Sequence, residues 1–264
     1  MDLSQPKVMG IINTTPDSFY SGSRKSSISE ILKTAEKMLS EGADFLDIGG
    51  YSSRPGAEDI DEVEELNRVI EPIKSILNEF PEAIISIDTF RSGVAKQAID
   101  SGAKMVNDIS AGYLDEDMLK TVAGLNVPYV AMHMKGSPQT MKKMTEYDDL
   151  LKEIVQYFSG VIENCNELGI KDVLIDPGFG FAKTAEQSFH LLQNLEHFHH
   201  LERHLLVGVS RKSMIYKTLE ITADNALNGT TVLNTVALLR GAAILRVHDV
   251  KEAVEVIKLV DQLK

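Results

Sequence analysis

The stretch SEGADFLDIG (residues 40–49) decides the fold, because it joins the end of a helix to a short apolar strand. The same order of residue types returns in DSGAKMVNDI (residues 100–109). In both stretches a glycine, Gly42 or Gly102, stands shortly before the apolar run, where helices commonly end on a left-handed glycine. The repetition predicts a chain built from alternating helices and strands.

Short apolar runs of this kind occur along the whole chain. They are Val8–Ile12, Phe45–Ile48, Ile84–Ile87, Met105–Ile109, Tyr129–Met132, Val173–Ile175, Leu205–Val209 and Ala242–Val247. Such runs suit strands covered on both faces, as in a parallel sheet. Amphipathic helical patterns separate them: Ile28–Ser40, Asp61–Glu79, Gly93–Ser101, Asp115–Gly124, Tyr147–Leu168, Ala185–Glu202, Asn225–Arg240 and Val250–Leu263. We therefore expect an α/β protein, a single-domain (β/α)8 TIM barrel over residues 1–264.

The composition limits the cellular compartment and the classes of molecule that the protein can bind. The formal charge of −12 argues against a nucleic-acid or anionic-membrane surface, because both polyanions would be repelled. The one cysteine, Cys165, has no partner in the chain for a disulfide, which fits a reducing compartment. The segment Met1–Lys7 lacks the apolar run of a signal peptide. We expect a cytoplasmic protein whose partners are small molecules, with no nucleic acid and no membrane.

Polar residues stand where the predicted strands end, which is where a barrel carries its chemistry. They are Asn13, Asp88, Asn107-Asp108, His133, Asp176, Ser210-Arg211-Lys212 and Arg246-Val247-His248. The second strand instead leads through Gly49-Gly50 into a loop with Ser52, Ser53 and Arg54. Helix caps need only Ser, Thr, Asp or Asn, so the added Arg, Lys and His indicate an enzyme active site.

The residue types suggest a polar heterocycle beside an anionic leaving group. Carboxylates can accept two parallel N–H bonds from a 2-aminopyrimidinone edge, which guanine and pterins share, and an amide and an ammonium can bind the ring acceptors. The residues of this set are Asp88, Asn107, Asp176 and Lys212. A cationic set, Arg54, Arg246 and His248, suits phosphate oxygens or stacking on a ring. Asn13 with the following Thr14–Asp17 loop offers oxygen ligands for a magnesium ion shared with a diphosphate.

The chain resembles the dihydropteroate synthase family from Val8 to about Asp249. The resemblance is carried by motifs in order: MGIINTTPDSF (9–19), DIGGYSSRPGA (47–57), SIDTF (86–90), VNDIS (106–110), MHMKGSPQTM (132–141), LIDPGFGF (174–181), GVSRKS (208–213) and RVHDV (246–250). It implies a transferase of folate biosynthesis. The reaction would condense 6-hydroxymethyl-7,8-dihydropterin diphosphate with p-aminobenzoate, giving 7,8-dihydropteroate and pyrophosphate.

The resemblance also assigns roles, position by position. The implied pterin contacts are Asp88, Asn107, Asp176, Lys212 and Arg246. Around p-aminobenzoate it places Ser53, Arg54, Pro55, Phe181, Lys212 and Ser213. At the diphosphate it places Asn13, Arg54, Arg246 and His248, with Asn13 as the Mg²⁺ ligand. The catalytic set that it implies is Arg246, His248, Lys212 and Asp88. A homodimer is expected from the resemblance alone.

Two departures from the family pattern lie in the first two loops. The second loop reads Tyr51-Ser52-Ser53-Arg54 where the family commonly has Glu-Ser-Thr-Arg, and Tyr51 has no assigned role. The first loop continues with Tyr20-Ser21-Gly22-Ser23 in place of an acidic residue and glycines. Two alternatives stay open: a pterin-binding methyltransferase module of the same superfamily, and a paralogue that binds pterin without turnover.

Overall fold

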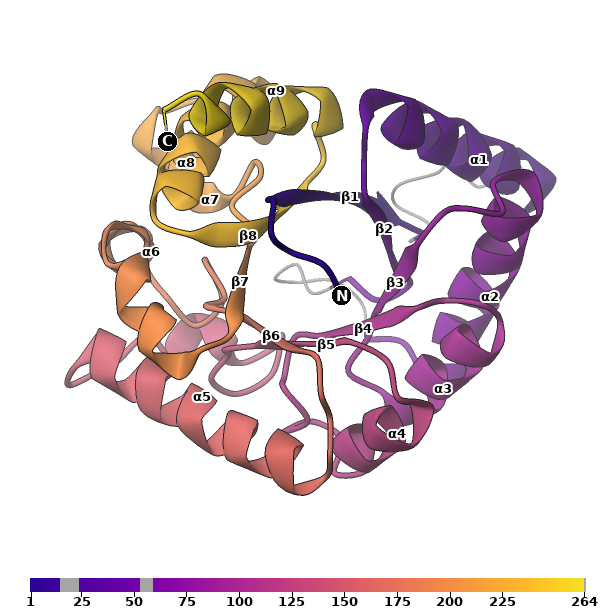
Figure 1. Cartoon of the computed structure of the whole chain (residues 1–264), viewed down its shortest axis with the longest axis horizontal. Helices are drawn as coiled ribbons and strands as arrows, with labels where there is room; N and C mark the ends of the chain where they lie inside the picture. The colour runs from indigo at the N-terminus through magenta and orange to yellow at the C-terminus, as the bar shows by residue number, and fades with distance from the viewer. Residues whose placement is uncertain (15–23, 53–58, 264) are drawn as a thin grey trace.

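A computed structural model describes residues 1–14, 24–52 and 59–263. Eight parallel strands form a closed ring in chain order, and β1 pairs with β8 as well as with β2. Helices surround the ring on its outside (Figure 1). The predicted (β/α)8 barrel is therefore confirmed.

The element bounds follow the predicted pattern closely. The strands are β1 Lys7–Asn13, β2 Phe45–Gly49, β3 Ile85–Asp88, β4 Met105–Asp108, β5 Tyr129–Met132, β6 Val173–Asp176, β7 His204–Val207 and β8 Ala242–Val247. The helices are α1 Arg24–Glu41, α2 Glu62–Glu79, α3 Ser92–Asp100, α4 Met118–Leu125, α5 Leu150–Glu167, α6 Ala185–Gln193, α7 Ser213–Thr218, α8 Leu227–Leu239 and α9 Val250–Asp261. Short 3-10 helices occupy η2 Met141–Lys143, η3 Leu195–Leu201 and η4 Ala223–Asn225. Gly42 and Gly102 have φ of 101° and 113°, which confirms the left-handed turns expected at these positions.

The predicted helix over 185–202 is wrong in its second half. Helix α6 ends before Asn194, whose φ of −110° and ψ of 24° leave the helical region. The Asn194 side chain donates to the carbonyl of His190 at 2.8 Å and so bonds the last turn. Beyond it, Leu195 and Phe198 are both buried. They are three residues apart, which is one turn of a 3-10 helix, so both side chains face the core even though the segment is not α-helical.

The hydrophobic core has an outer and an inner part. The outer part lies between the strands and the surrounding helices, and its largest side chains include Phe158 and Phe198. The inner part fills the ring itself, and Leu3 packs against it. The N-terminus lies over the middle of the ring (Figure 1), and the Met1 amine contacts the Asp172 carboxylate at 3.3 Å. The first residues therefore cover the amino end of the barrel.

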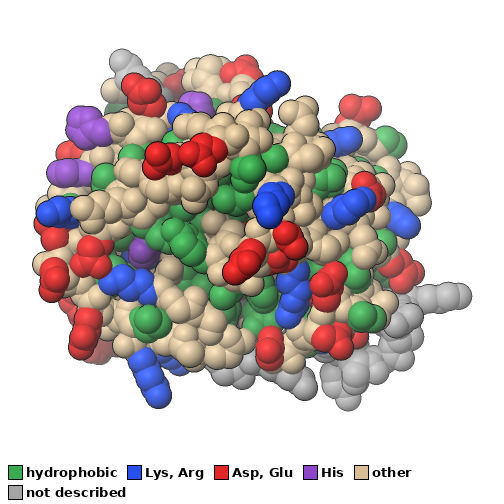
Figure 2. Space-filling view, turned by 90° about the horizontal axis from the view of Figure 1, so that it is seen from below, with side chains coloured by type: hydrophobic (Ala, Val, Ile, Leu, Met, Phe, Trp, Pro, Cys, Tyr) green, Lys and Arg blue, Asp and Glu red, His purple; other side chains and the backbone are tan. Residues whose placement is uncertain are grey.

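The surface carries charges of both signs. Acidic and basic side chains are interspersed with hydrophobic ones over the face shown in Figure 2. Within the described ranges, no helix is both long enough and apolar enough to cross a membrane.

Candidate active site

On four of the strands, the inner face changes from an apolar to a polar side chain over a step of two residues. An apolar cluster in the ring is formed by Met9, Phe45, Met105, Val130, Leu174, Leu206 and Ile244. Because side chains alternate between the two faces of a strand, the residue two positions later faces the same way. Those residues are Ile11, Asp47, Asn107, Met132, Asp176, Gly208 and Arg246. The polar ones therefore form a layer at the carboxyl ends of the strands, next to the apolar cluster.

Arg246 lies between two carboxylates from different strands. Its Nε donates to Oδ2 of Asp47 at 2.6 Å, and its Nη2 donates to Oδ2 of Asp88 at 2.5 Å. Asn107 donates through Nδ2 to the same oxygen of Asp47 at 3.0 Å. The Asp47 side chain is 0% exposed, whereas those of Asp88 and Arg246 are 20% and 19% exposed. A ligand can therefore reach Asp88 and Arg246, while Asp47 lies out of contact with solvent.

The surroundings of this group shift two pKa values. Burial is the main cause that raises the pKa of Asp88 to about 7, since Arg246 lowers it and Asp47 raises it again. Burial lowers the pKa of Arg246, but the charges of Asp47 and Asp88 outweigh it, so the pKa is raised overall. The site thus combines a permanent cation with a carboxylate that titrates near neutral pH.

Asp176 and Lys212 form the second charged part of the layer. Lys212 Nζ donates to the carbonyl of Phe179 at 2.7 Å and lies 4.8 Å from the ring centroid of Phe181. Burial lowers the pKa of Lys212 to about 8, and the Asp176 carboxylate opposes this shift. Burial also raises the pKa of Asp176, although Lys212 lowers it. Each group therefore stabilises the charged form of the other.

Gly208 keeps the space between the two charged parts open. A Cβ atom at this position would lie 3.8 Å from Lys212 Nζ and 3.8 Å from Arg246 Cβ. A longer side chain would fill the volume that these two cations border. The glycine therefore leaves room for a ligand between an ammonium, a guanidinium and the carboxylates beside them.

The loop after β6 is fixed by a buried lysine that the sequence did not single out. Lys183 Nζ donates to the carbonyls of Gly178 and Phe181, both at 3.0 Å, and contacts His133 Nδ1 at 2.8 Å. Burial lowers the pKa of His133 to about 2, with the charge of Lys183 adding to the shift, so its ring is neutral and can accept this bond. The predicted strand-end residue His133 thus fixes the loop after β6 through Lys183. It has no hydrogen bond to the network of Arg246, Asp47, Asp88 and Asn107 among the described residues.

His248 and Asn13 lie at the ends of the adjacent strands β8 and β1. The His248 ring nitrogen Nδ1 lies 3.0 Å from Ser210 Oγ, and its backbone N–H donates to the same oxygen at 3.1 Å. Asn13 is the last residue of β1 and is partly exposed. The next residue, Thr14, donates its hydroxyl and its N–H to the carbonyl of Gly49 at 3.1 and 2.9 Å. The Thr14 hydroxyl is thus engaged with the Gly49 carbonyl, which leaves the side-chain amide of Asn13 as the group at the end of β1 that can bind a metal ion or a substrate.

The structure brings most of the predicted site residues to one end of the barrel. Asn107 and Arg246 both donate to Asp47, Arg246 also donates to Asp88, and Phe181 lies beside Lys212. Ser213 begins α7, directly after Lys212. The predicted residues Ser53, Arg54 and Pro55 lie outside the described residues. Asp47 was missed because it stands inside an apolar run, although its spacing of two from Phe45 places it on the inner face.

Tyr51, to which the sequence pattern assigns no role, links three loops. Its hydroxyl accepts a hydrogen bond from Gln139 Nε2 at 2.6 Å and donates to Asp59 Oδ1 at 3.1 Å. Its ring packs edge-on against Phe90, with centroids 5.0 Å apart. The loop after β2 is therefore joined to the loops after β3 and β5 through one tyrosine.

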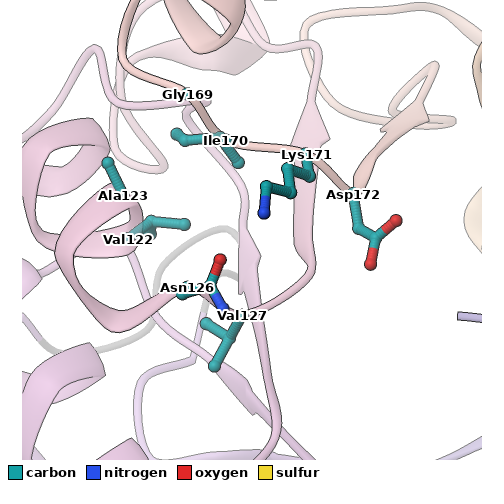
Figure 3. Close-up of a pocket in the computed structure, with 8 residues that line it drawn as sticks. All are labelled: Val122, Ala123, Asn126, Val127, Gly169, Ile170, Lys171 and Asp172. Atoms are coloured by element: carbon teal, nitrogen blue, oxygen red, sulfur yellow. The ribbon is translucent and has the colours of Figure 1, made fainter.

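A surface hollow lies at the opposite end of the barrel. It is bordered by the last turn of α4 and the Asn126 that follows it, and by the segment 169–172 that leads into β6 (Figure 3). Val127 and Asp172 in its lining precede β5 and β6, so the hollow is at the amino ends of the strands. It is separate from the polar layer.

Comparisons with known proteins agree along the whole chain. Residues 9–248 match the family model described as "Pterin binding enzyme". The dihydropteroate synthase of Escherichia coli K12 is 41% identical over 263 residues, 99% of this chain and 93% of its own length. That of Synechocystis is 43% identical over 259 residues, 97% of this chain and 89% of its own. A Yersinia pestis dihydropteroate synthase structure with a sulfonamide drug has a TM-score of 0.93 at 40% identity, covering 100% of this chain and 96% of that one.

Proposed function

Since the chain belongs to the pterin-binding enzyme family and is similar over almost its full length to dihydropteroate synthases, we propose that its strand-end layer is the active site of this reaction. The reaction condenses 6-hydroxymethyl-7,8-dihydropterin diphosphate with p-aminobenzoate and yields 7,8-dihydropteroate and pyrophosphate. A related structure from Xanthomonas albilineans, 34% identical with a TM-score of 0.89, is described in complex with 7,8-dihydropteroate. The chain is thus a transferase of folate synthesis.

One observation carries the assignment of the pterin pocket. Gly208 leaves space beside Lys212 and Arg246, and these two cations are linked by hydrogen bonds and charge to further polar side chains at the strand ends. Together the pocket residues are Asp88, Asn107, Asp176, Lys212 and Arg246. Carboxylates accept the paired N–H groups of the pterin edge, and the cations bind its ring acceptors. The part of Asp88 and Arg246 that is exposed is the part that a flat ring can contact.

The diphosphate is bound by the cations next to the pterin. Arg246 and His248 bind its oxygens, together with Arg54 from outside the described residues. Mg²⁺ fits this site, because one amide ligand such as Asn13 with phosphate oxygens and waters is a usual set for this ion. When bound, the ion supplies positive charge that stabilises the departing pyrophosphate.

The arylamine attacks from the side of the loops. We assign Phe181 and Lys212 to this side, since Lys212 Nζ lies 4.8 Å from the Phe181 ring centroid, and Ser213 begins the following helix. The predicted residues Ser53, Arg54 and Pro55 complete the p-aminobenzoate set. As the C–O bond breaks, its electron pair leaves with pyrophosphate and the electron-rich pterin carries positive charge on its exocyclic carbon. The amine attacks that carbon, and the resulting ammonium releases a proton to water. No covalent enzyme intermediate and no strong general base are required.

Pyrophosphate release tests this function directly. The enzyme is mixed with the pterin diphosphate, p-aminobenzoate and Mg²⁺, and pyrophosphate and dihydropteroate are measured together. We expect both products in equal amounts, and only when both substrates are present. A protein that binds the pterin substrate without releasing pyrophosphate would support the non-catalytic alternative and contradict the proposal.

The pH dependence of kcat/KM for the pterin substrate is expected to be bell-shaped. As the pH falls through about 7, Asp88 takes up a proton and loses an acceptor. As the pH rises through about 8, Lys212 loses its proton and its charge. Lys212→Arg should remove the alkaline limb from this range, since arginine does not deprotonate in proteins. An alkaline limb that stays near pH 8 in this variant would contradict the assignment to Lys212.

We also propose a homodimer that uses helix α8. This helix exposes Val232 (52%) and Leu239 (59%) on its outer side. Sedimentation should give about twice the chain mass of 29.1 kDa. Val232→Glu should shift the protein toward the monomer, because a charge in an apolar contact is unfavourable. Val63→Glu on α2, where Val63 is 66% exposed, introduces the same charge at another exposed valine, and a dimer that persists in it but not in Val232→Glu would assign the contact to α8. A wild-type protein that sediments as one chain would overturn the proposal.

We also propose that the protein is located in the cytoplasm. The thiol of Cys165 is free and buried, and burial raises its pKa to about 11. An unreactive, unpaired thiol is compatible with a reducing compartment. Fractionation of cells that express a tagged chain tests this, and recovery outside the cytoplasmic fraction would contradict it.

A further inference from the structure

Asp47 connects parts of the ring that are not neighbours. In the strand register Asp47 of β2 lies beside Ile11 of β1, and Met9 of β1 lies beside Arg246 of β8. The bond from Arg246 to Asp47 therefore crosses β1, and the bond from Asn107 on β4 to Asp47 crosses β3. One buried carboxylate thus fixes two predicted ligand-binding side chains from opposite directions.

Two carboxylates share one cation here, so one carboxylate can leave the cation for a ligand while the other stays bound. Asp47 and Asp88 both bond to the single guanidinium of Arg246. If Asp88 turned to a ligand without Asp47 present, Arg246 would lose its only ion pair in this group. With Asp47 present, the Nε bond stays in place. Asp47 Oδ1 is buried and has no hydrogen-bond partner among the described residues, so the carboxylate retains an acceptor.

We infer that Asp47 is a positioning residue, a buried anion that holds Arg246 and Asn107 while Asp88 exchanges its bond with Arg246 for a bond with the substrate. The inference rests on the proposed function, in which Asp88 binds the pterin. Asp47 itself does not touch the substrate, because its side chain is fully buried behind Arg246. Its removal should act through the geometry of Arg246 and through the charge felt by Asp88.

Two variants separate these effects. Asp47→Ala removes both hydrogen bonds, and we expect kcat/KM for the pterin diphosphate to fall by about 10²-fold, the loss typical of a misplaced binding group. The KM for p-aminobenzoate should stay unchanged. Asp47→Asn keeps an oxygen acceptor but removes the charge. Asp44→Asn is the matched control: it makes the same charge change just before β2, where Asp44 bonds Lys7, and should change neither quantity.

The pH profile supplies a readout that a purely structural role would not move. The charged groups that act on Asp88 are Arg246 on β8, Asp47 on β2, Glu65 on α2, Asp108 on β4 and Lys212 before α7. Asp47 is one of those that raise the pKa of Asp88. Asp47→Asn should therefore shift the acidic limb of kcat/KM to lower pH, whereas Asp44→Asn should leave it where it is.

A measurement without substrate separates this inference from the proposed function. The Nε–H of Arg246, assigned by its loss in Arg246→Lys, should exchange slowly with solvent in the wild type and in Asp44→Asn. It should exchange rapidly in Asp47→Ala. Slow exchange in Asp47→Ala, or an unshifted acidic limb with normal kcat/KM in Asp47→Asn, would overturn the inference. If Asp47→Ala fails to fold, Asp47→Asn decides. A wild type without turnover would overturn the proposed function instead, and the exchange result would still stand.

Discussion

Arg246→Met is expected to lower kcat/KM for the pterin diphosphate by about 10³-fold, the upper range for removal of one charge-stabilising donor. Methionine keeps much of the volume of the arginine stem but has no group to bind pterin or diphosphate. It also leaves Asp47 and Asp88 without their shared cation. Steady-state kinetics of the two substrates measure the loss, and it should appear mainly with the pterin diphosphate.

The same change should destabilise the fold, because two close carboxylates lose their counter-ion. Breaking a buried pair from one side typically costs about 3–5 kcal/mol, which chemical denaturation can measure. Arg246→Lys separates the two effects, since it keeps the charge but cannot donate in the fixed fork that reaches both carboxylates. It should stay folded and still lose activity. Arg240→Lys, at a surface pair with Glu196, is the control and should behave like the wild type. Normal kinetics in Arg246→Lys would exclude a role for the fork.

Gly178→Ala is the second change with a large expected effect, and it acts on the loop after β6. Gly178 has φ of 71°, and a Cβ built on it would lie 2.1 Å from the backbone carbonyl oxygen of His133. A left-handed conformation costs a non-glycine residue about 1–2 kcal/mol. Because the overlapping atom belongs to the backbone, the loop must also move. We expect a total loss of about 3 kcal/mol or more in the free energy of unfolding.

Gly180→Ala offers a matched control in the same loop. Gly180 has nearly the same φ, 77°, but its nearest neighbour to an added Cβ is Lys212 Cδ at 3.8 Å. This variant should lose only the left-handed cost, about 1 kcal/mol. Denaturant unfolding of both variants gives the difference. Equal losses would show that the contact with the His133 carbonyl does not determine the effect.

The fold could be predicted from the sequence because its signal is local. Each short apolar run overlaps an observed strand, and runs such as Tyr129–Met132 and Ala242–Val247 match the observed strands to the residue. Turn glycines such as Gly42 add an independent local signal. The end of α6 was missed because Leu195 and Phe198 continue an apolar pattern that a 3-10 helix serves equally well.

The site was only partly predictable, because its members meet through ring closure. Arg246 and Asp88 are 158 residues apart, and no local sequence pattern predicts the bond between them. Their positions at strand ends were visible, since polar residues break the apolar runs there. Asp47 and Lys183 were not singled out, because what distinguishes each of them is a set of long-range contacts. Tyr51 also gains its role only from loops brought together by the fold.

On a strand such as β2, the apolar cluster and the polar layer are only two residues apart, and this spacing limits which insertions and deletions the gene can tolerate. A deletion of one residue within β2 would turn Ile48 inward in place of Asp47, and so remove a charge from the site and a side chain from the outer core at once. Substitutions affect one layer at a time, whereas changes of strand length damage both together. Insertions and deletions should therefore accumulate in the connections between strands and helices, and hardly ever inside the strands.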